Sequence, residues 1–146
     1  MANQSALDTL IELAQRDTDD AAKRLGAALK AVEEAQQKEQ MLTGYRDDYA
    51  KKLEQAQMNG ITPMAYQNFV AFMAKLDNAI GGQREIVKHA QYKAGAEKTR
   101  WQDAERKRLS YTTLSNRAAE EALRLENKRD QKQMDEHAAR QAYYRR

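Results

Sequence analysis

The sequence predicts an all-α protein in which two long helices form an antiparallel coiled-coil hairpin, with the second helix longer and projecting past the first. Charged residues make up 32% of the chain and aromatic residues 7%, with one proline and no cysteine. Strong helix formers dominate this composition and strand formers are scarce. Apolar residues recur about every 3.5 positions, which is typical of a coiled coil. One strong turn signal, Asn59-Gly60, divides this pattern in two.

The first predicted helix covers about residues 3–57. Its apolar stripe is interrupted only by Thr18, Glu39 and Arg46. A stripe of this period keeps one narrow face toward a partner helix, and its many alanines indicate close packing. The stripe consists of Leu7, Ile11, Ala14, Thr18, Ala21, Leu25, Ala28, Val32, Ala35, Glu39, Leu42, Arg46, Tyr49, Leu53 and Ala56.

The turn is predicted at residues 58–62 and the second helix at about 63–142. Thr62 is a favourable N-cap and Pro63 suits the first helical turn. The doublet Gly81-Gly82 is expected to kink or loosen this helix locally, with a functional hinge as the alternative. The second stripe holds Phe69, Met73, Leu76, Ile80, Gln83, Val87, Ala90, Ala94, Glu97, Trp101, Ala104, Arg108, Tyr111, Ser115, Ala118, Ala122 and Leu125, and then turns polar at Arg129, Lys132 and Glu136.

A turn near Gly60 sets the register of the two helices. Facing residues should have numbers that sum to about 120, which places Leu7 opposite the region of Thr113. The second helix would then project by ~20 residues, or about 30 Å at 1.5 Å per residue. Residues 1–146 are expected to form a single coiled-coil domain.

Nothing in the sequence predicts catalysis, a metal site or a cofactor. The G-x-x-x-x-G-K-[ST] pattern of a P-loop is absent, and the two histidines, His89 and His137, are 48 residues apart in predicted helices. No apolar run approaches the ~20 residues that span a bilayer, and the N-terminus lacks the pattern of a secretory signal. We therefore expect a cytoplasmic protein that is not an enzyme.

The charge is unevenly distributed. Residues 1–20 carry one arginine and five acids, whereas residues 87–117 carry eight lysines and arginines and three acids. The stretch Lys88 to Arg108 also holds Tyr92 and Trp101, so a nucleic-acid surface is one interpretation. Trp101 occupies a stripe position, however, and a solvated charged face explains the same residues. We expect no nucleic-acid partner.

Two aromatic residues, Tyr45 and Phe72, fall outside the stripes. Exposed aromatics on a slender coiled coil often mark a contact with a partner. The alternative is that a two-helix hairpin packs extra side chains around a narrow core. The pairs 42 with 79, 45 with 76 and 49 with 72 each sum to 121, which predicts one apolar patch of Leu42, Tyr45, Tyr49, Phe72, Leu76 and Ala79.

The segment from Leu125 to Glu136, L-E-N-K-R-D-Q-K-Q-M-D-E, has no apolar residue between Leu125 and Met134. Glu126 with Asp130, and Lys128 with Lys132, are like-charge pairs at i, i+4, which weaken an isolated helix. A frayed terminus is one interpretation. A segment held by a partner is the other.

Several stretches carry a resemblance that covers essentially the whole length: A-L-D-T-L-I-E-L-A, D-D-A-A, M-L-T-G-Y, the N-G turn and the block that ends at Glu136. In these stretches the chain resembles the FliJ family, the small coiled-coil stalk proteins of the bacterial flagellar type III export apparatus. The last block is specific because coiled-coil packing does not require its polar identities. Lys38 and Gln83 depart from the Gln and His of the family.

The resemblance implies a stalk that promotes export of flagellar proteins and is peripherally associated with the inner-membrane flagellar base. Its helical termini would enter the ring of the export ATPase FliI, which FliH regulates. A patch on the hairpin would contact the export gate protein FlhA, and flagellar export chaperones would bind at residues that the resemblance does not assign. The implied gate-binding residues are Leu42, Tyr45, Tyr49, Phe72, Leu76 and Ala79. The implied ATPase-binding residues are Leu7, Leu10, Leu13, Leu125, Asn127, Asp130, Lys132, Met134 and Asp135.

Two other classes of function are open at this point. One is a nucleic-acid-binding helical hairpin, whose binding would depend steeply on salt. The other is a dimeric coiled-coil scaffold. For the stalk we expect a monomeric hairpin with weak self-association.

Overall fold

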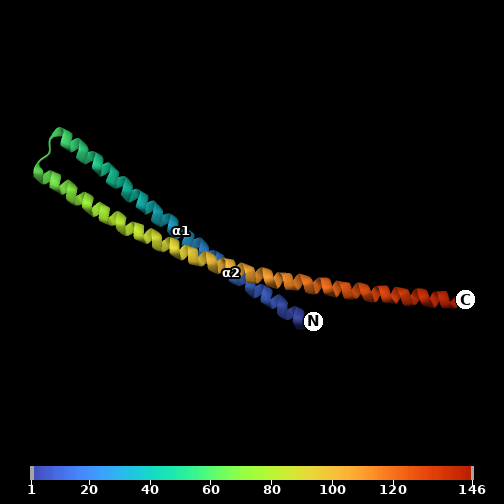
Figure 1. Ribbon diagram of the computed structural model, residues 1–146. Helices are drawn as coiled ribbons and strands as arrows, with labels where there is room; N and C mark the ends of the chain where they lie inside the picture. Colours follow the sequence, from blue (N-terminus) through green and yellow to red (C-terminus); the bar gives the residue numbers. More distant parts are fainter. Residues whose placement is uncertain (1, 146) are drawn as a thin grey trace. The chain divides into compact units, whose positions relative to one another are not determined.

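The computed structural model describes residues 2–145, which form two long helices and no strand (Figure 1). Helix α1 spans Ala2–Asn59 and helix α2 spans Pro63–Tyr144. The two helices pack against each other, so the all-α hairpin predicted from the sequence is confirmed.

The turn between the helices is built by Gly60 and Thr62. Gly60 has a φ of 88°, a left-handed conformation that glycine adopts without strain, and its N–H donates to the Gln57 carbonyl at 3.4 Å. Thr62 caps α2, because its hydroxyl oxygen accepts a hydrogen bond from the Ala65 N–H at 3.2 Å. The chain therefore reverses where the sequence has its turn signal.

The described chain divides into two compact units. The turn unit comprises residues 20–102, and the terminal unit comprises residues 2–19 together with 103–145. Each contains a segment of α1 and a segment of α2. The single domain expected from the sequence stays a prediction.

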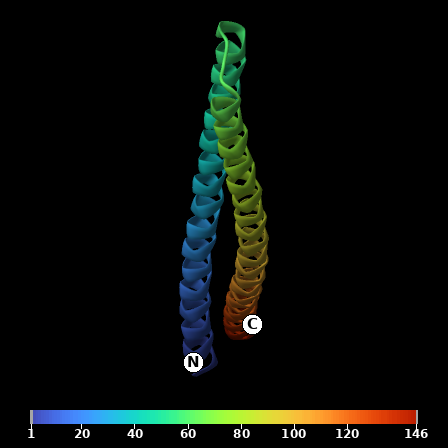
Figure 2. The same cartoon turned by 90° about the vertical axis from the view of Figure 1, so that its left-hand side faces the viewer.

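In the turn unit, α1 and α2 lie side by side and antiparallel (Figure 2). Every predicted stripe residue from Ala21 to Ala56 and from Phe69 to Trp101 is buried or half-buried. Interhelical contacts join residues whose numbers sum to between 118 and 123, which confirms the predicted register there. These contacts are Gln83 with Ala35, Arg84 with Glu39, Arg46 with Asp77, Arg24 with Glu97, and Tyr49 with Phe69 and Phe72.

The polar stripe residues of the turn unit find partners across the seam. The Gln83 side-chain amide donates to the Ala35 carbonyl at 2.9 Å, and Glu39 accepts from Arg84 at 3.1 Å. Arg46 donates to Asp77, and this hydrogen bond raises the pKa of Arg46. Such paired polar groups fix one alignment of two helices, since a slipped register would leave them without partners.

In the terminal unit, the seam ends at Ser115. The stripe residues from Leu7 to Thr18 and from Ala104 to Ser115 are buried or half-buried. From Asn116 to Arg145 every residue of α2 is exposed. In this register Ala2 lies level with about residue 118, so α2 has no described α1 residue beside it farther on. The stripe that continues in the sequence through Ala118, Ala122 and Leu125 is therefore not packed.

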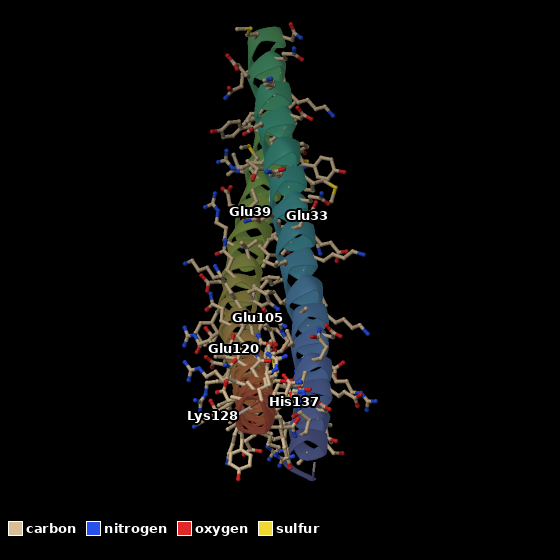
Figure 3. All side chains as sticks on the ribbon, turned by 90° about the vertical axis from the view of Figure 1, so that its right-hand side faces the viewer. Glu33, Glu39, Glu105, Glu120, Lys128 and His137 are labelled. Carbon is tan, nitrogen blue, oxygen red and sulfur yellow. The ribbon has the colours of Figure 1, made fainter. Side chains whose placement is uncertain are left out.

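The C-terminal stretch of α2 projects past the N-terminal stretch of α1, as predicted (Figure 1). We call residues 116–145 the overhang. Its exposed side chains include Lys128 and His137, both labelled in Figure 3.

Gly81 and Gly82 do not interrupt α2, which is one continuous helix through both residues. A Cβ built on either glycine would meet no other atom within 4 Å. The loosened turn expected from the sequence is thus absent from the described helix.

Candidate protein-interaction sites

The first candidate site is the aromatic patch, formed by Leu42, Tyr45, Tyr49, Phe72, Leu76 and Ala79 in the turn unit. The ring centroids of Tyr49 and Phe72 lie 4.5 Å apart, with an interplanar angle of 46°. Tyr45 is 55% exposed and Phe72 is 45% exposed, whereas Leu42, Tyr49 and Leu76 are half-buried. Half-buried seam residues thus support two exposed aromatic rings, an arrangement common at protein interfaces.

The aromatic patch lies on one side of the seam. Tyr45, Phe72 and Ala79 each come one position before a stripe residue, and such positions on two antiparallel helices share a side. The interhelical pairs Arg46–Asp77 and Arg84–Glu39 involve residues that come one position after the stripe, on the other side. Around the patch, one side of the seam therefore carries exposed aromatic rings and the other carries ion pairs.

The structure places Met41 next to the aromatic patch and places Gln83 in the core. Met41, one helical turn before Tyr45, is 50% exposed and could have been found by its spacing from Tyr45. Gln83 is only 5% exposed and donates into the seam, so it is part of the core. Lys38 is exposed.

The second candidate site lies in the terminal unit and falls into two separate groups. On α1, Leu7 is half-buried, while Leu10 and Leu13 are 42% and 49% exposed. The second group is the block of Leu125, Asn127, Asp130, Lys132, Met134 and Asp135, all exposed. Leu7 lies level with about residue 113, so the block begins about 18 Å farther along α2.

The overhang presents charge in all directions. Arg124 donates two hydrogen bonds to the Glu121 carboxylate, at 3.1 and 2.6 Å, and they lower the pKa of Glu121. Gln131, which lies between two residues of the block, donates from its amide to Asp135 at 3.5 Å. Met134 is 69% exposed among these polar groups. A partner with polar groups would complement this exposed, charged surface.

Two exposed leucines of the terminal unit were not predicted as site residues from the sequence. Leu109 and Leu114 are 49% and 51% exposed. The sequence could have indicated them, because both leucines fall outside the apolar stripe of α2. They lie near the level of Leu7 and Leu10, and they add apolar surface to this part of the unit.

The basic stretch from Lys88 to Arg108 is partly neutralised within its own helix. Lys88 pairs with Glu85 at 3.4 Å, and Arg106 pairs with Asp103 at 3.8 Å. Trp101 is half-buried in the seam, whereas Tyr92 is 80% exposed. One exposed aromatic ring in a stretch whose cations are partly paired is a weak nucleic-acid footprint.

Metal-binding groups and membrane-spanning stretches are both absent from the described residues. Among residues 2–145, no group of three or more His, Asp or Glu side chains is placed to hold a metal ion. Neither helix, over the part that the structure describes, has a stretch apolar enough to cross a membrane.

Comparison with known proteins identifies the family. Residues 3–146 match the family described as Flagellar FliJ protein. The chain belongs to the FliJ family. The Flagellar FliJ protein of Salmonella typhi is 33% identical over 142 residues, and that of Escherichia coli K12 is 32% identical over 142 residues. Each match covers 97% of both chains, so this FliJ-family member aligns with its relatives nearly end to end.

A solved structure shares the fold. It is described as that of a YscO homologue, CT670 from Chlamydia trachomatis, and superposes with a TM-score of 0.50 at 14% sequence identity. The match covers 94% of this chain and 90% of the other. At this identity the likeness extends to the fold alone.

Proposed function

We propose that this FliJ-family chain is a non-enzymatic stalk and adaptor of the flagellar type III export apparatus, which promotes export of flagellar proteins. Membership of the FliJ family supports a role for the chain in flagellar export. The observation that carries the proposed stalk and adaptor role is that two exposed surfaces belong to different units. The aromatic patch belongs to the turn unit and the polar overhang to the terminal unit.

In this proposal, the helical termini insert into the ring of the export ATPase FliI, whose regulator is FliH. A helix in a ring pore is surrounded by side chains from several subunits, so it needs polar surface on every side. The overhang has such a surface, since every residue from Asn116 to Arg145 is exposed and no apolar residue lies between Leu125 and Met134.

The aromatic patch would contact the soluble part of the export gate FlhA. Its exposed rings Tyr45 and Phe72 stand on half-buried neighbours, so they can bury apolar area on binding without rearranging the helices. Contact with FlhA would associate the chain peripherally with the membrane-embedded flagellar base. Flagellar export chaperones are further proposed partners, with no residues assigned.

Binding to the gate is tested by replacing both exposed rings, Tyr45→Ala with Phe72→Ala. Loss of two interface aromatics should weaken binding to the soluble domain of FlhA by about tenfold or more, measured by isothermal titration calorimetry. The matched control is Leu29→Ala, because Leu29 is 54% exposed in the same unit but lies outside the patch. Equal affinities for the double variant and the control would refute the assignment.

Binding to the ATPase is tested with Asp130→Ala combined with Met134→Ala. Both side chains are exposed, so helicity by circular dichroism should be unchanged while capture of FliI falls by about tenfold. The control is Glu120→Ala with Leu123→Ala, an acid and an exposed leucine that precede the block. If the block variant captures FliI as well as the wild type does, the overhang is not the ATPase-binding segment.

A further inference from the structure

The turn unit contains a groove that the proposed function does not use. It has a volume of about 460 Å³ and lies between α1 and α2. We call it the alanine groove. Its apolar lining consists of Ala27, Ala28, Ala31, Ala35, Ile86 and Ala90.

The dimensions of the alanine groove fit one α-helix. Its lining residues span 24–35 on α1 and 86–97 on α2. At 1.5 Å per residue each wall is about 17 Å long, or three helical turns. Alanine walls allow a third helix to approach to the ~8 Å at which helices with small side chains pack. A longer side chain at Ala31 would obstruct that approach.

The alanine groove lies on the same side of the seam as the aromatic patch. Ala31 and Ile86 each come one position before a stripe residue, as Tyr45 and Phe72 do. Ile86 is 54% exposed, although β-branched apolar side chains of this size are usually buried. The groove and the patch therefore form one apolar side of the unit, interrupted near Lys38 and Gly82. The interhelical ion pairs Arg46–Asp77 and Arg84–Glu39 lie on the other side, whereas the pair Arg24–Glu97 lies at the groove itself.

Positive charge borders the alanine groove. Lys93 lines it, is exposed, and forms no ion pair with any residue in the range 2–145. At one end Glu97 is 7% exposed and is shared by two arginines, with Arg100 at 3.0 Å and Arg24 at 3.8 Å. One carboxylate for two guanidinium groups leaves excess positive charge, and the Arg24 side chain is 59% exposed. Carboxylates on a docked helix would complement this rim.

We propose that the alanine groove binds an amphipathic helix of a partner protein. That helix has a stripe of small and aliphatic residues, which enters the groove, and glutamates or aspartates along its edges, which face Lys93 and Arg24. The result is a local three-helix bundle. This site goes beyond the proposed function, since it does not involve the aromatic patch or the overhang.

The test uses a synthetic, fluorescein-labelled helical peptide of about 20 residues, enough for more than the three turns of the groove. It carries alanine and leucine at heptad positions a and d and glutamate at e and g. A second peptide has lysine in place of each glutamate. Fluorescence anisotropy with the full chain should show saturable binding of the acidic peptide and at least about tenfold weaker binding of the lysine peptide.

Variants locate the binding site. Ile86→Asp should weaken the acidic peptide about tenfold or more, while Leu29→Asp should change it less than about twofold. Ile86 and Leu29 are both 54% exposed, but only Ile86 lines the groove. Ala31→Gln, which fills the groove without adding charge, should weaken binding as Ile86→Asp does. Thermal melting of each variant establishes that it is folded.

Charge reversal tests the rim. Lys93→Glu should bind the lysine peptide better than the acidic one, whereas Lys98→Glu should keep the preference of the wild type. Lys98 is exposed on the same helix but does not line the groove. No saturable binding of the acidic peptide, or equal effects of Ile86→Asp and Leu29→Asp, would overturn the proposal.

Two other occupants have their own readouts. A labelled single-stranded oligonucleotide that displaces the peptide, and whose binding is lost in Ile86→Asp, would assign the groove to nucleic acid. Sedimentation that shows a dimer of the wild type and a monomer of Ile86→Asp would assign it to a second copy of the chain. Either result overturns the proposal. The peptide assay contains neither FliI nor FlhA, so its outcome is independent of the proposed function.

Discussion

Glu97 is a buried carboxylate in a seam whose buried residues are mostly apolar. It is 7% exposed and its oxygen atoms face two arginines, yet Oε2 accepts no hydrogen bond within the described residues. Its partners Arg24 and Arg100 keep 59% and 67% of their side chains exposed, so water already solvates them. Desolvation of the carboxylate is therefore only partly offset by the arginines. Glu97 contributes to specific alignment of the helices more than to stability.

Replacement of Glu97 with leucine should stabilise the protein. Leucine suits the seam position, and the two arginines are already solvated, so we expect Glu97→Leu to raise the free energy of unfolding by about 1 kcal/mol. The control is Glu85→Leu on the same helix, where the side chain is 73% exposed and the change should stay within ~0.5 kcal/mol. Urea unfolding followed by circular dichroism measures both. A loss of stability in Glu97→Leu would mean that the ion pairs outweigh desolvation.

The helices, the turn and the register were predictable because each depends on local rules. A 3.5-residue period identifies the buried face of each helix. Asn59-Gly60 followed by Thr62-Pro63 identifies the turn at which the chain reverses direction. The partners of polar stripe residues were not predictable, because Gln83, Glu39 and Arg46 are bonded to residues that are distant in sequence. The end of packing at Ser115 also depends on the length of the opposite helix, which no local pattern in α2 records.

Gly81 and Gly82 are helical residues that alanine could replace. Their φ values are not positive, and there is room for a Cβ at both. Gly81→Ala and Gly82→Ala should each raise the free energy of unfolding by ~1 kcal/mol, because alanine loses less backbone entropy in a helix. Thermal and urea unfolding test this. By contrast, Gly60→Ala should be destabilising, since Gly60 has a φ of 88°.

The same alanine variants test whether a hinge is needed at Gly81-Gly82. In a bacterium that lacks its own FliJ, the double variant should restore swimming in soft agar as well as the wild-type chain does. A stabilised variant with poor swimming would indicate that bending of α2 at this point has a function.

At the scale of the whole molecule, the chain keeps its candidate surfaces in different units. Sequence pairing alone placed Tyr45 and Phe72 on the hairpin near the turn, since antiparallel register is simple arithmetic. Leu7, Leu10 and Leu13 were grouped with the block from Leu125 because of the family resemblance. A resemblance matches residue types between sequences but gives no distances between residues. In the register of the two helices, the three leucines of α1 lie level with residues of α2 that come before the block. The alanine groove could not be predicted, because alanines at stripe positions are expected to be buried core residues and not the lining of a groove.

Separate surfaces should be separable by truncation. Removal of residues 117–146 keeps every seam residue of α2 through Ser115, and the described residues that it deletes, 117–145, are all exposed, so it should leave the melting temperature within a few degrees of the wild type. In our proposal the truncated chain keeps its affinity for the soluble domain of FlhA, because the aromatic patch is intact. It loses capture of FliI, because the block from Leu125 is gone. Parallel calorimetry with FlhA and pull-down with FliI measure the two properties on one protein. Joint loss of both interactions in a chain that still melts cooperatively would show that the overhang contributes to gate binding as well, and that the two surfaces do not act separately.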